Sequence, residues 1–208
     1  MQTAEILEKY MPAPAVPQAV EWLERYRVQM RITAPRKTKL GDYRAPYGRQ
    51  GHRISVNSDL NPYSFLITFV HEMAHLLTWE RHRRKASPHG SEWKQAYREL
   101  MLPILQMNIF PDDVAMALSR YMRNPAASSC NDTDLYKTLS RYNSSEKSSG
   151  CYLEELSPGT RFALENGRQF TMLKKLRKFY LCSEVDSGRH FRISPLMQVY
   201  PLNSEGQG

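Results

Sequence analysis

Residues 62–79 read PYSFLITFVHEMAHLLTW, and this stretch decides the fold. Its apolar residues fall on every side of a helical wheel, and Pro62 stands at the first turn, where proline is well tolerated. Asp59 or Asn61 is available to cap the helix. A helix that is apolar on all faces is buried in the middle of a domain. The sequence therefore predicts one long, central, buried helix.

Polar side chains interrupt this helix at His71, Glu72 and His75, which form an HExxH motif. Residues four apart lie on the same face of a helix, so both imidazoles can reach one ion. Zinc accepts such nitrogens, and a catalytic zinc site leaves one position open for water. Glu72 can take a proton from that water without binding the metal. The motif predicts a zinc site with Glu72 as catalytic base; the alternative is two core histidines held by hydrogen bonds.

A third ligand has to come from outside the motif. We favour His89, because Gly90 lets the backbone approach closely and Ser91 can cap the helix that follows. His82 lies among arginines and a lysine whose charges oppose a nearby cation. Glu99 lies at a plausible distance but lacks the acidic surroundings that such a ligand usually has. His82 and Glu99 remain the alternatives to His89.

Hydrophobic periodicity predicts further elements along the chain. Helices are expected over residues 3–10, 17–29, 91–102, 111–123 and 132–142, and short strands over residues 30–34 and 52–57. Near the C-terminus, Asn166-Gly167 and Asp186-Ser187-Gly188 are hairpin signals between alternating apolar residues. Several strands and turns in some fifty residues are typical of a small barrel of SH3-like size.

The composition changes along the chain and suggests an α+β protein in two parts. The segment SSEKSSG at 144–150 has the composition of a flexible linker. We therefore expect a mainly helical domain with a small sheet over residues 1–125. A short helix and the linker follow over 126–150, and a small β-rich module over 151–203.

The charge balance restricts the class of partner. The chain has 29 Lys and Arg against 21 Asp and Glu, a net charge of +8. Residues 1–125 carry 18 basic and 12 acidic side chains, so +6 of this surplus belongs to the predicted metal-binding part. Such a surplus suits an acidic partner such as nucleic acid, and the alternative is a solvated basic face.

The cysteines and the hydropathy bear on the compartment. Three cysteines without a CxxC pair exclude a zinc ribbon of four thiolates and fit a reducing environment. Polar residues interrupt the longest apolar stretch, so no membrane span is predicted. The N-terminal residues do not resemble a signal peptide, and we expect a cytoplasmic protein.

Two motifs together resemble the SprT-like zinc metallopeptidases, the family that includes eukaryotic Spartan. These motifs are HEMAH at 71–75 and, after a loop, HGSEW at 89–93. The runs LGDYR at 40–44 and RISVN at 53–57 are also similar to that family's approach to the metal helix. The resemblance covers about residues 15–125.

This resemblance implies a zincin-like metallopeptidase domain in which His71, His75 and His89 hold zinc and Glu72 is the catalytic base. Family members of the Spartan type cut proteins crosslinked to DNA and are switched on by DNA. The resemblance thus implies a zinc-dependent endopeptidase in DNA repair, with DNA-associated or DNA-crosslinked proteins as substrates and DNA as a partner. The alternatives are a nucleic-acid-binding or regulatory module with a structural or idle zinc site, and an ImmA/IrrE-like protease dedicated to one repressor.

Overall fold

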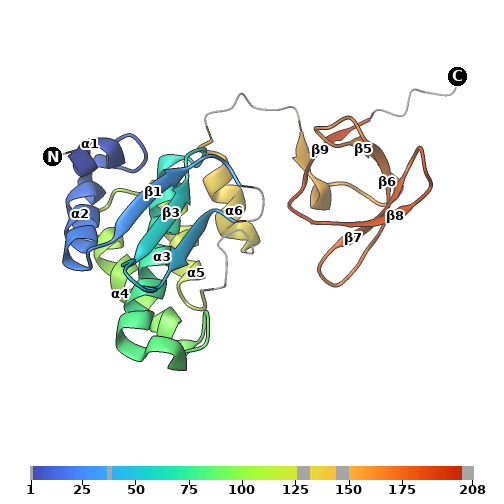
Figure 1. Cartoon of the computed structure of the whole chain (residues 1–208). Helices are drawn as coiled ribbons and strands as arrows, with labels where there is room; N and C mark the ends of the chain where they lie inside the picture. The colour runs from blue at the N-terminus through green and yellow to red at the C-terminus, as the bar shows by residue number, and fades with distance from the viewer. Residues whose placement is uncertain (1, 37–38, 126–131, 144–149, 203–208) are drawn as a thin grey trace, which may run out of the picture. The chain divides into compact units, whose positions relative to one another are not determined.

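The chain folds into two compact units, Met1–Ser144 and Ser145–Gly208, in the computed structural model (Figure 1). Within the described residues there are six α-helices and two β-sheets, which confirms the α+β class. The structure describes residues 2–36, 39–125, 132–143 and 150–202. No helix in these ranges is long and apolar enough to cross a membrane.

The first unit combines the helices with a three-stranded sheet (Figure 1). The helices are α1 (Gln2–Leu7), α2 (Val16–Arg25), α3 (Pro62–His82), α4 (Ser91–Gln106), α5 (Asp112–Tyr121) and α6 (Thr133–Ser140). The strands are β1 (Gln29–Thr33), β2 (Gly41–Arg44) and β3 (Arg53–Asn57). The strand order is β1-β3-β2, with β1 parallel and β2 antiparallel to β3. Helix α3 packs against β2, β3 and α4, so it is the centre of this unit.

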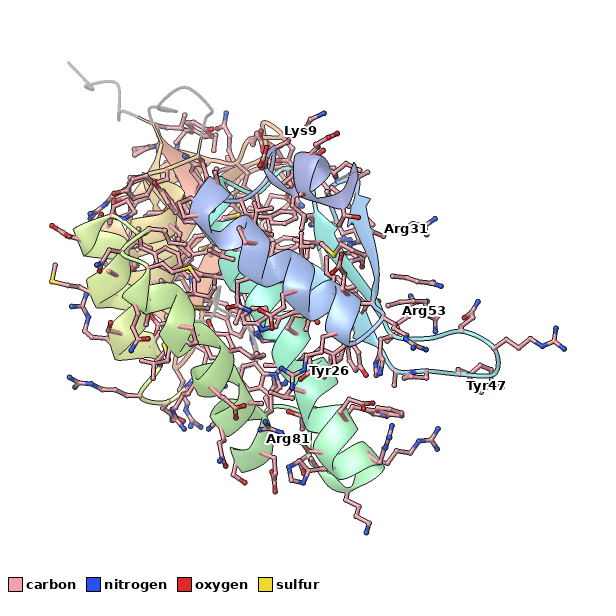
Figure 2. All side chains as sticks on the ribbon, turned by 90° about the vertical axis from the view of Figure 1, so that its left-hand side faces the viewer. Lys9, Tyr26, Arg31, Tyr47, Arg53 and Arg81 are labelled. Carbon is pink, nitrogen blue, oxygen red and sulfur yellow. The ribbon has the colours of Figure 1, made fainter. Side chains whose placement is uncertain are left out.

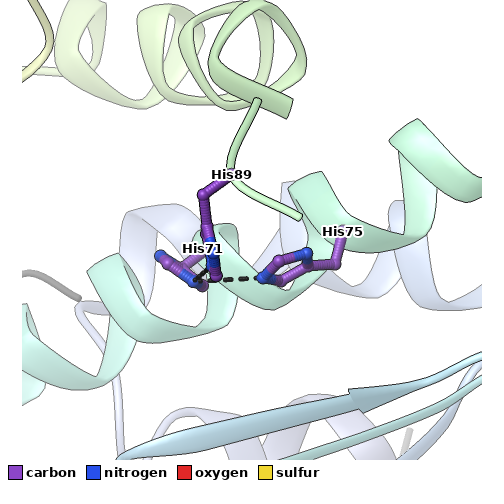
Figure 3. A group of neighbouring side chains, drawn as sticks. All are labelled: His71, His75 and His89. Atoms are coloured by element: carbon purple, nitrogen blue, oxygen red, sulfur yellow. Dashed lines mark hydrogen bonds between the residues drawn. The ribbon is translucent and has the colours of Figure 1, made fainter. Parts of the chain in front are cut away.

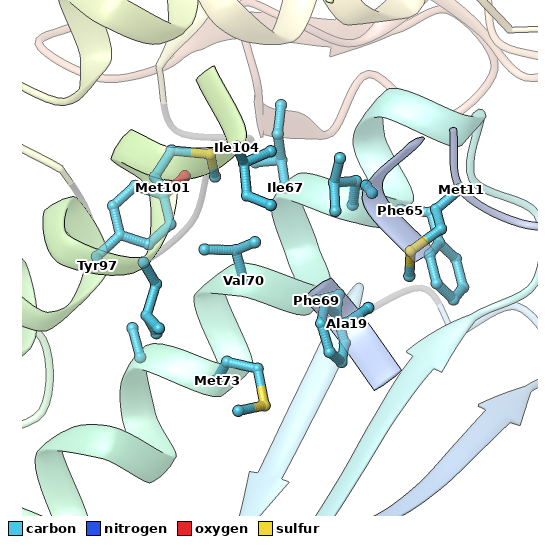
Figure 4. Close-up of a cluster of buried hydrophobic side chains, with 14 of the residues drawn as sticks. Met11, Ala19, Phe65, Ile67, Phe69, Val70, Met73, Tyr97, Met101 and Ile104 are labelled. Atoms are coloured by element: carbon cyan, nitrogen blue, oxygen red, sulfur yellow. The ribbon is translucent and has the colours of Figure 1, made fainter. Parts of the chain in front are cut away.

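The predicted central helix is present as α3, and its sequence explains its position. Asn61 caps it, because its side-chain oxygen accepts a hydrogen bond of 2.9 Å from the backbone N–H of Ser64. Phe69 belongs to one continuous apolar core with Ala19 of α2 and Met101 of α4 (Figure 4). A fully buried Phe or Met side chain contributes roughly 1.5–3 kcal/mol of hydrophobic stabilisation. Burial on all sides therefore fixes the helix that carries the HExxH motif.

The second unit is a six-stranded antiparallel sheet with a core of its own. Its strands are β4 (Cys151–Tyr152), β5 (Arg161–Ala163), β6 (Gln169–Lys175), β7 (Tyr180–Glu184), β8 (His190–Ile193) and β9 (Gln198–Pro201), in the order β4-β9-β5-β6-β7-β8. Hairpins β5–β6 and β7–β8 enclose the two predicted turns, and Gly167 has a φ of +80° that glycine adopts without strain. Among the described residues no pairing joins β4 to β8, so the SH3-like barrel stays a prediction.

Two local predictions were wrong. The helix expected over 17–29 ends at Arg25, because Arg27 takes a φ of +49° and Gln29 already begins β1 beside Arg53. Ser91 is not the cap of α4, since Gly90 holds the cap position and the Ser91 hydroxyl donates to Glu92. Strand β2 (Gly41–Arg44) was not predicted from the sequence. The linker at 144–150 lies almost wholly outside the described residues.

Candidate metal centre

Helix α3 and the loop before α4 bring three histidines together. His71 and His75 lie one turn apart on α3, and His89 lies two residues before α4. The Nε2 atom of His71 lies 3.2 Å from Nε2 of His89 and 3.3 Å from Nε2 of His75. Figure 3 shows the three rings converging on a common point. One nitrogen of each ring lies within 4.8 Å of the others, so the group could hold one metal ion.

The spacing of these nitrogens fits a tetrahedral ion. With zinc–nitrogen bonds of about 2.0–2.1 Å at tetrahedral angles, two ligand nitrogens lie about 3.3 Å apart. The Nε2 atom of His71 is 3.2 and 3.3 Å from those of its two neighbours. Three nitrogen ligands leave one position of a tetrahedron free, as in catalytic zinc sites.

Burial holds the three imidazoles in their neutral form. Burial, with repulsion from His75 and His89, lowers the pKa of His71 to about 3. Burial, with repulsion from His89, lowers the pKa of His75 to about 4, and burial also lowers the pKa of His89. A neutral imidazole keeps a lone pair for a metal, so near pH 7 these groups need not lose a proton before binding.

The loop that carries His89 is held in an unusual backbone conformation. His89 has a φ of +57°, a region that residues other than glycine rarely adopt and that costs of order 1–3 kcal/mol. The buried ring of Trp93 lies under the group, 4.6 Å from His71, 5.5 Å from His75 and 4.8 Å from His89 between ring centroids. This ring contacts all three histidines; the sequence indicated Trp93 as an inward-facing residue of its helix, and its contact with the histidines was not predicted.

Glu72 lies on the side of α3 that faces β2. It is only 6% exposed, and burial, with repulsion from Asp42, raises its pKa to about 8. The backbone N–H of Tyr43 donates a hydrogen bond to its carboxylate and opposes this rise in pKa. A Cβ atom at Gly41 would lie 2.5 Å from Oε1 of Glu72, so only glycine leaves room here. The glycine of the LGDYR run therefore shapes the position of the carboxylate.

The other two candidate ligands do not join this group. The guanidinium of Arg81 donates to both carboxylate oxygens of Glu99, at 2.7 and 2.8 Å. His82 is exposed at the last position of α3. Within the described residues, the group of nearby metal-ligating side chains contains His71, His75 and His89 and neither alternative.

A second polar network supports the group from the side of the sheet, and sequence reasoning missed it. The ring of Tyr43 lies parallel to that of His75, with centroids 6.4 Å apart and an angle of 3°. Nδ1 of His52 lies 2.9 Å from the Tyr43 hydroxyl, and its Nε2 lies 3.1 Å from a carboxylate oxygen of Glu80. Burial lowers the pKa of His52 although Glu80 opposes it, so the neutral ring donates to Glu80 and accepts from Tyr43. Tyr43 therefore packs inside the site, between His75 and His52.

Comparison with known families identifies the part of the chain that carries this geometry. Residues 16–110 match the model of the SprT-like family. This segment belongs to the SprT-like family. The SprT-like segment runs from the start of α2 to just past the end of α4, and it contains all three histidines and Glu72. The resemblance drawn from the HEMAH and HGSEW motifs is thus confirmed. No curated protein and no solved structure matches the chain.

Proposed function

We propose that the chain is a zinc-dependent endopeptidase that acts on proteins associated with DNA or crosslinked to it. The observation that carries this proposal is the spacing of the three Nε2 atoms next to the HExxH glutamate. The match of residues 16–110 to the SprT-like family supports it independently, because it does not depend on side-chain positions. In this proposal His71, His75 and His89 hold zinc.

Glu72 has the properties of the proton carrier in this reaction. A bound zinc ion would supply a Lewis acid that lowers the pKa of a water molecule and polarises a peptide carbonyl. Glu72 would accept a proton from the attacking water and pass it to the leaving amine. Burial raises the pKa of this carboxyl and so favours the protonated form between the two proton transfers, whereas the charge of a bound zinc ion would favour the ionised form that takes the first proton. General acid–base catalysis by one such group contributes roughly 10²–10⁴-fold to the rate.

Strand β2 offers a place for an extended polypeptide substrate. It is the terminal strand in the order β1-β3-β2, so one of its edges has no partner strand among the described residues. Gly41 on this strand lies against Glu72. A peptide that added to this edge as a further strand would run past the carboxylate. This arrangement suits a protein substrate that is at least locally unfolded.

The association with DNA rests on charge and on the family. Residues 1–125, which include the candidate metal centre, carry a net charge of +6. Basic side chains bind the phosphates of any nucleic acid sequence. Such a protease would therefore select a substrate protein by its position on DNA rather than by its identity.

Cleavage assays with Glu72→Gln test this proposal. The zinc-loaded chain is incubated with a protein crosslinked to single-stranded DNA, and with the same protein free, each with and without a chelator. We expect cleavage by the natural chain, loss of cleavage with the chelator, and a loss of at least about 100-fold in Glu72→Gln. Zinc content, measured by elemental analysis, should be equal in the two chains, because Glu72 is not a proposed ligand.

Three outcomes would contradict the proposal. Full cleavage by Glu72→Gln would exclude Glu72 as the proton carrier. Binding of DNA with no cleavage of any protein, by a chain loaded with zinc, would favour the alternative of a nucleic-acid-binding module with an idle metal site. Cleavage of one repressor protein and of no unfolded substrate would favour the dedicated protease.

A further inference from the structure

The face of the three-stranded sheet that points away from α3 is open and basic. Side chains alternate along a strand, so Ile54 and Val56 of β3 are buried against the helices while Arg53 and Ser55 point outward. Figures 1 and 2 show no helix over this side in the described part of the first unit. In Figure 2, Arg31 and Arg53 extend away from the helices on this side. We call the outward side of β1, β2 and β3, together with Arg36, the outer face.

The outer face forms a hollow whose charge is strongly positive. Its volume is about 510 Å³, and its lining includes one carboxylate, Asp42. Asp42 is already neutralised by Nζ of Lys39 at 2.8 Å and by Nε of Arg44 at 2.9 Å. The arginines that line the hollow are Arg31, Arg36, Arg44 and Arg53. Three of these four, all except Arg44, form no ion pair with a carboxylate in the part of the chain that the structure describes.

Two of these arginines are held in place but are incompletely satisfied. Arg36 donates from Nε to Asn57 at 2.8 Å and from Nη1 to Ser55 at 3.1 Å, which lays its guanidinium along β3. Among the described residues, its Nη2 is buried without an acceptor, and so is Nε of Arg53. Arg53 also donates from Nη1 to Gln50. A buried cationic donor without an acceptor costs free energy, and an anion in the hollow would remove that cost.

The sheet register spaces the arginines across neighbouring strands. Gln29 of β1 and Arg44 of β2 lie opposite Arg53, and Arg31 lies opposite Ser55. Arg31 and Arg53 are therefore offset by two positions, or roughly 7 Å along the strands. Positive groups distributed in this way suit a chain of phosphates better than one small anion. The planar guanidinium fork also matches phosphate oxygens in pairs.

An exposed aromatic ring lies at the end of the same sheet. Tyr47, in the hairpin between β2 and β3, is 79% exposed, and Figure 2 shows it on the side of Arg53. Such a ring can stack on an unpaired base, and every base of a single strand offers a face for stacking. We infer that the outer face binds the phosphate backbone of single-stranded nucleic acid. The identity of the polyanion as nucleic acid rests on the proposed function, whereas the location of the binding surface rests on the arginines.

Binding of a fluorescein-labelled oligothymidylate, followed by fluorescence anisotropy, tests this surface. The full chain is compared with the double variant Arg31→Gln/Arg53→Gln and with a matched control, Arg84→Gln/Lys85→Gln. The control removes the same charge from two exposed residues of the turn after α3. We expect the dissociation constant to rise by about tenfold in the first variant, with a salt slope smaller by about 1.4, since each lost phosphate contact lowers it by about 0.7. The control should change both much less. Arg31→Gln alone, which alters no hydrogen bond of the sheet, should lower the slope by about 0.7.

The outcomes separate this surface from the protease. Equal weakening in both double variants would overturn the inference, because any basic surface would then suffice. Displacement of the oligonucleotide by polyglutamate or by inorganic phosphate as effectively as by unlabelled oligothymidylate would overturn it as well. Cleavage of a free unfolded protein by the natural chain is measured in parallel. Binding that depends on these arginines, without any cleavage, would exclude the proposed function and support the binding surface. Cleavage together with unaltered binding in Arg31→Gln/Arg53→Gln would exclude the binding surface and leave the proposed function.

Discussion

His89 tests the metal proposal most directly, because it alone comes from outside the HExxH helix. We expect His89→Ala to weaken zinc binding by more than the roughly 10–100-fold that loss of an outer-shell partner costs. Zinc per chain is measured by elemental analysis after dialysis against a competing chelator. His82→Ala and Glu99→Gln are the controls, since neither side chain lies in the histidine group. If His89→Ala retained zinc and one of the controls lost it, the third ligand would be the residue changed in that control and not His89.

Sequence reasoning identified some residues of the candidate site and missed the contacts of others. The spacing of His71 and His75 is a property of one helix, so the local pattern was sufficient. His89 had to be chosen among three candidates, because its approach depends on a loop with a positive φ that no periodicity indicates. The contact of Trp93 with all three rings comes from the packing of α4 on α3. Such long-range packing leaves no signal in a single sequence.

Strand β2 positions Glu72 through the absence of a side chain at Gly41. We expect Gly41→Ala to lower the free energy of unfolding by about 1–3 kcal/mol, as overpacking of a filled site does. Cleavage should fall as well, because the new Cβ would lie only 2.5 Å from Oε1 of Glu72 and would displace the carboxylate. Thermal unfolding, cleavage rate and zinc content are measured together. Gly51→Ala is the control, since its Cβ would meet its nearest atom at an ordinary 3.7 Å. Equal losses in both variants would contradict this account.

Helices and strands differed in how well the sequence predicted them. Helix α3 combines a proline, a cap and continuous burial, so its start was correct and its end was short by three residues. Strand β2 has four residues, of which Asp42 and Arg44 point outward, and a run this polar and short carries no clear alternation. The apolar stripe of α2 continued to Val28 in the sequence, although the helix ends at Arg25. The stripe persisted because the chain turns there into a strand that packs on the same core.

The described residues form two apolar cores, one in each compact unit. Helix α6 follows the composition change at 125, yet it belongs to the first core through Leu135 and Leu139. The side-chain amide of Asn61 also donates to the backbone oxygen of Leu139 at 2.9 Å, which joins α6 to the cap of α3. The helix that carries the HExxH motif is thus braced by a segment well beyond the residues that match the family model.

Two truncated chains measure this bracing. A chain that ends at residue 143 keeps α6 and should bind zinc as the full chain does, because the whole first core is retained. A chain that ends at residue 125 loses two buried leucines, each worth roughly 1.5–3 kcal/mol, and should unfold roughly 10 °C lower or more. Circular dichroism on heating measures both transitions, and elemental analysis measures zinc. Equal melting temperatures would show that α6 contributes nothing to the first unit. Failure of both chains to fold would show instead that the first unit depends on the second, despite its separate core.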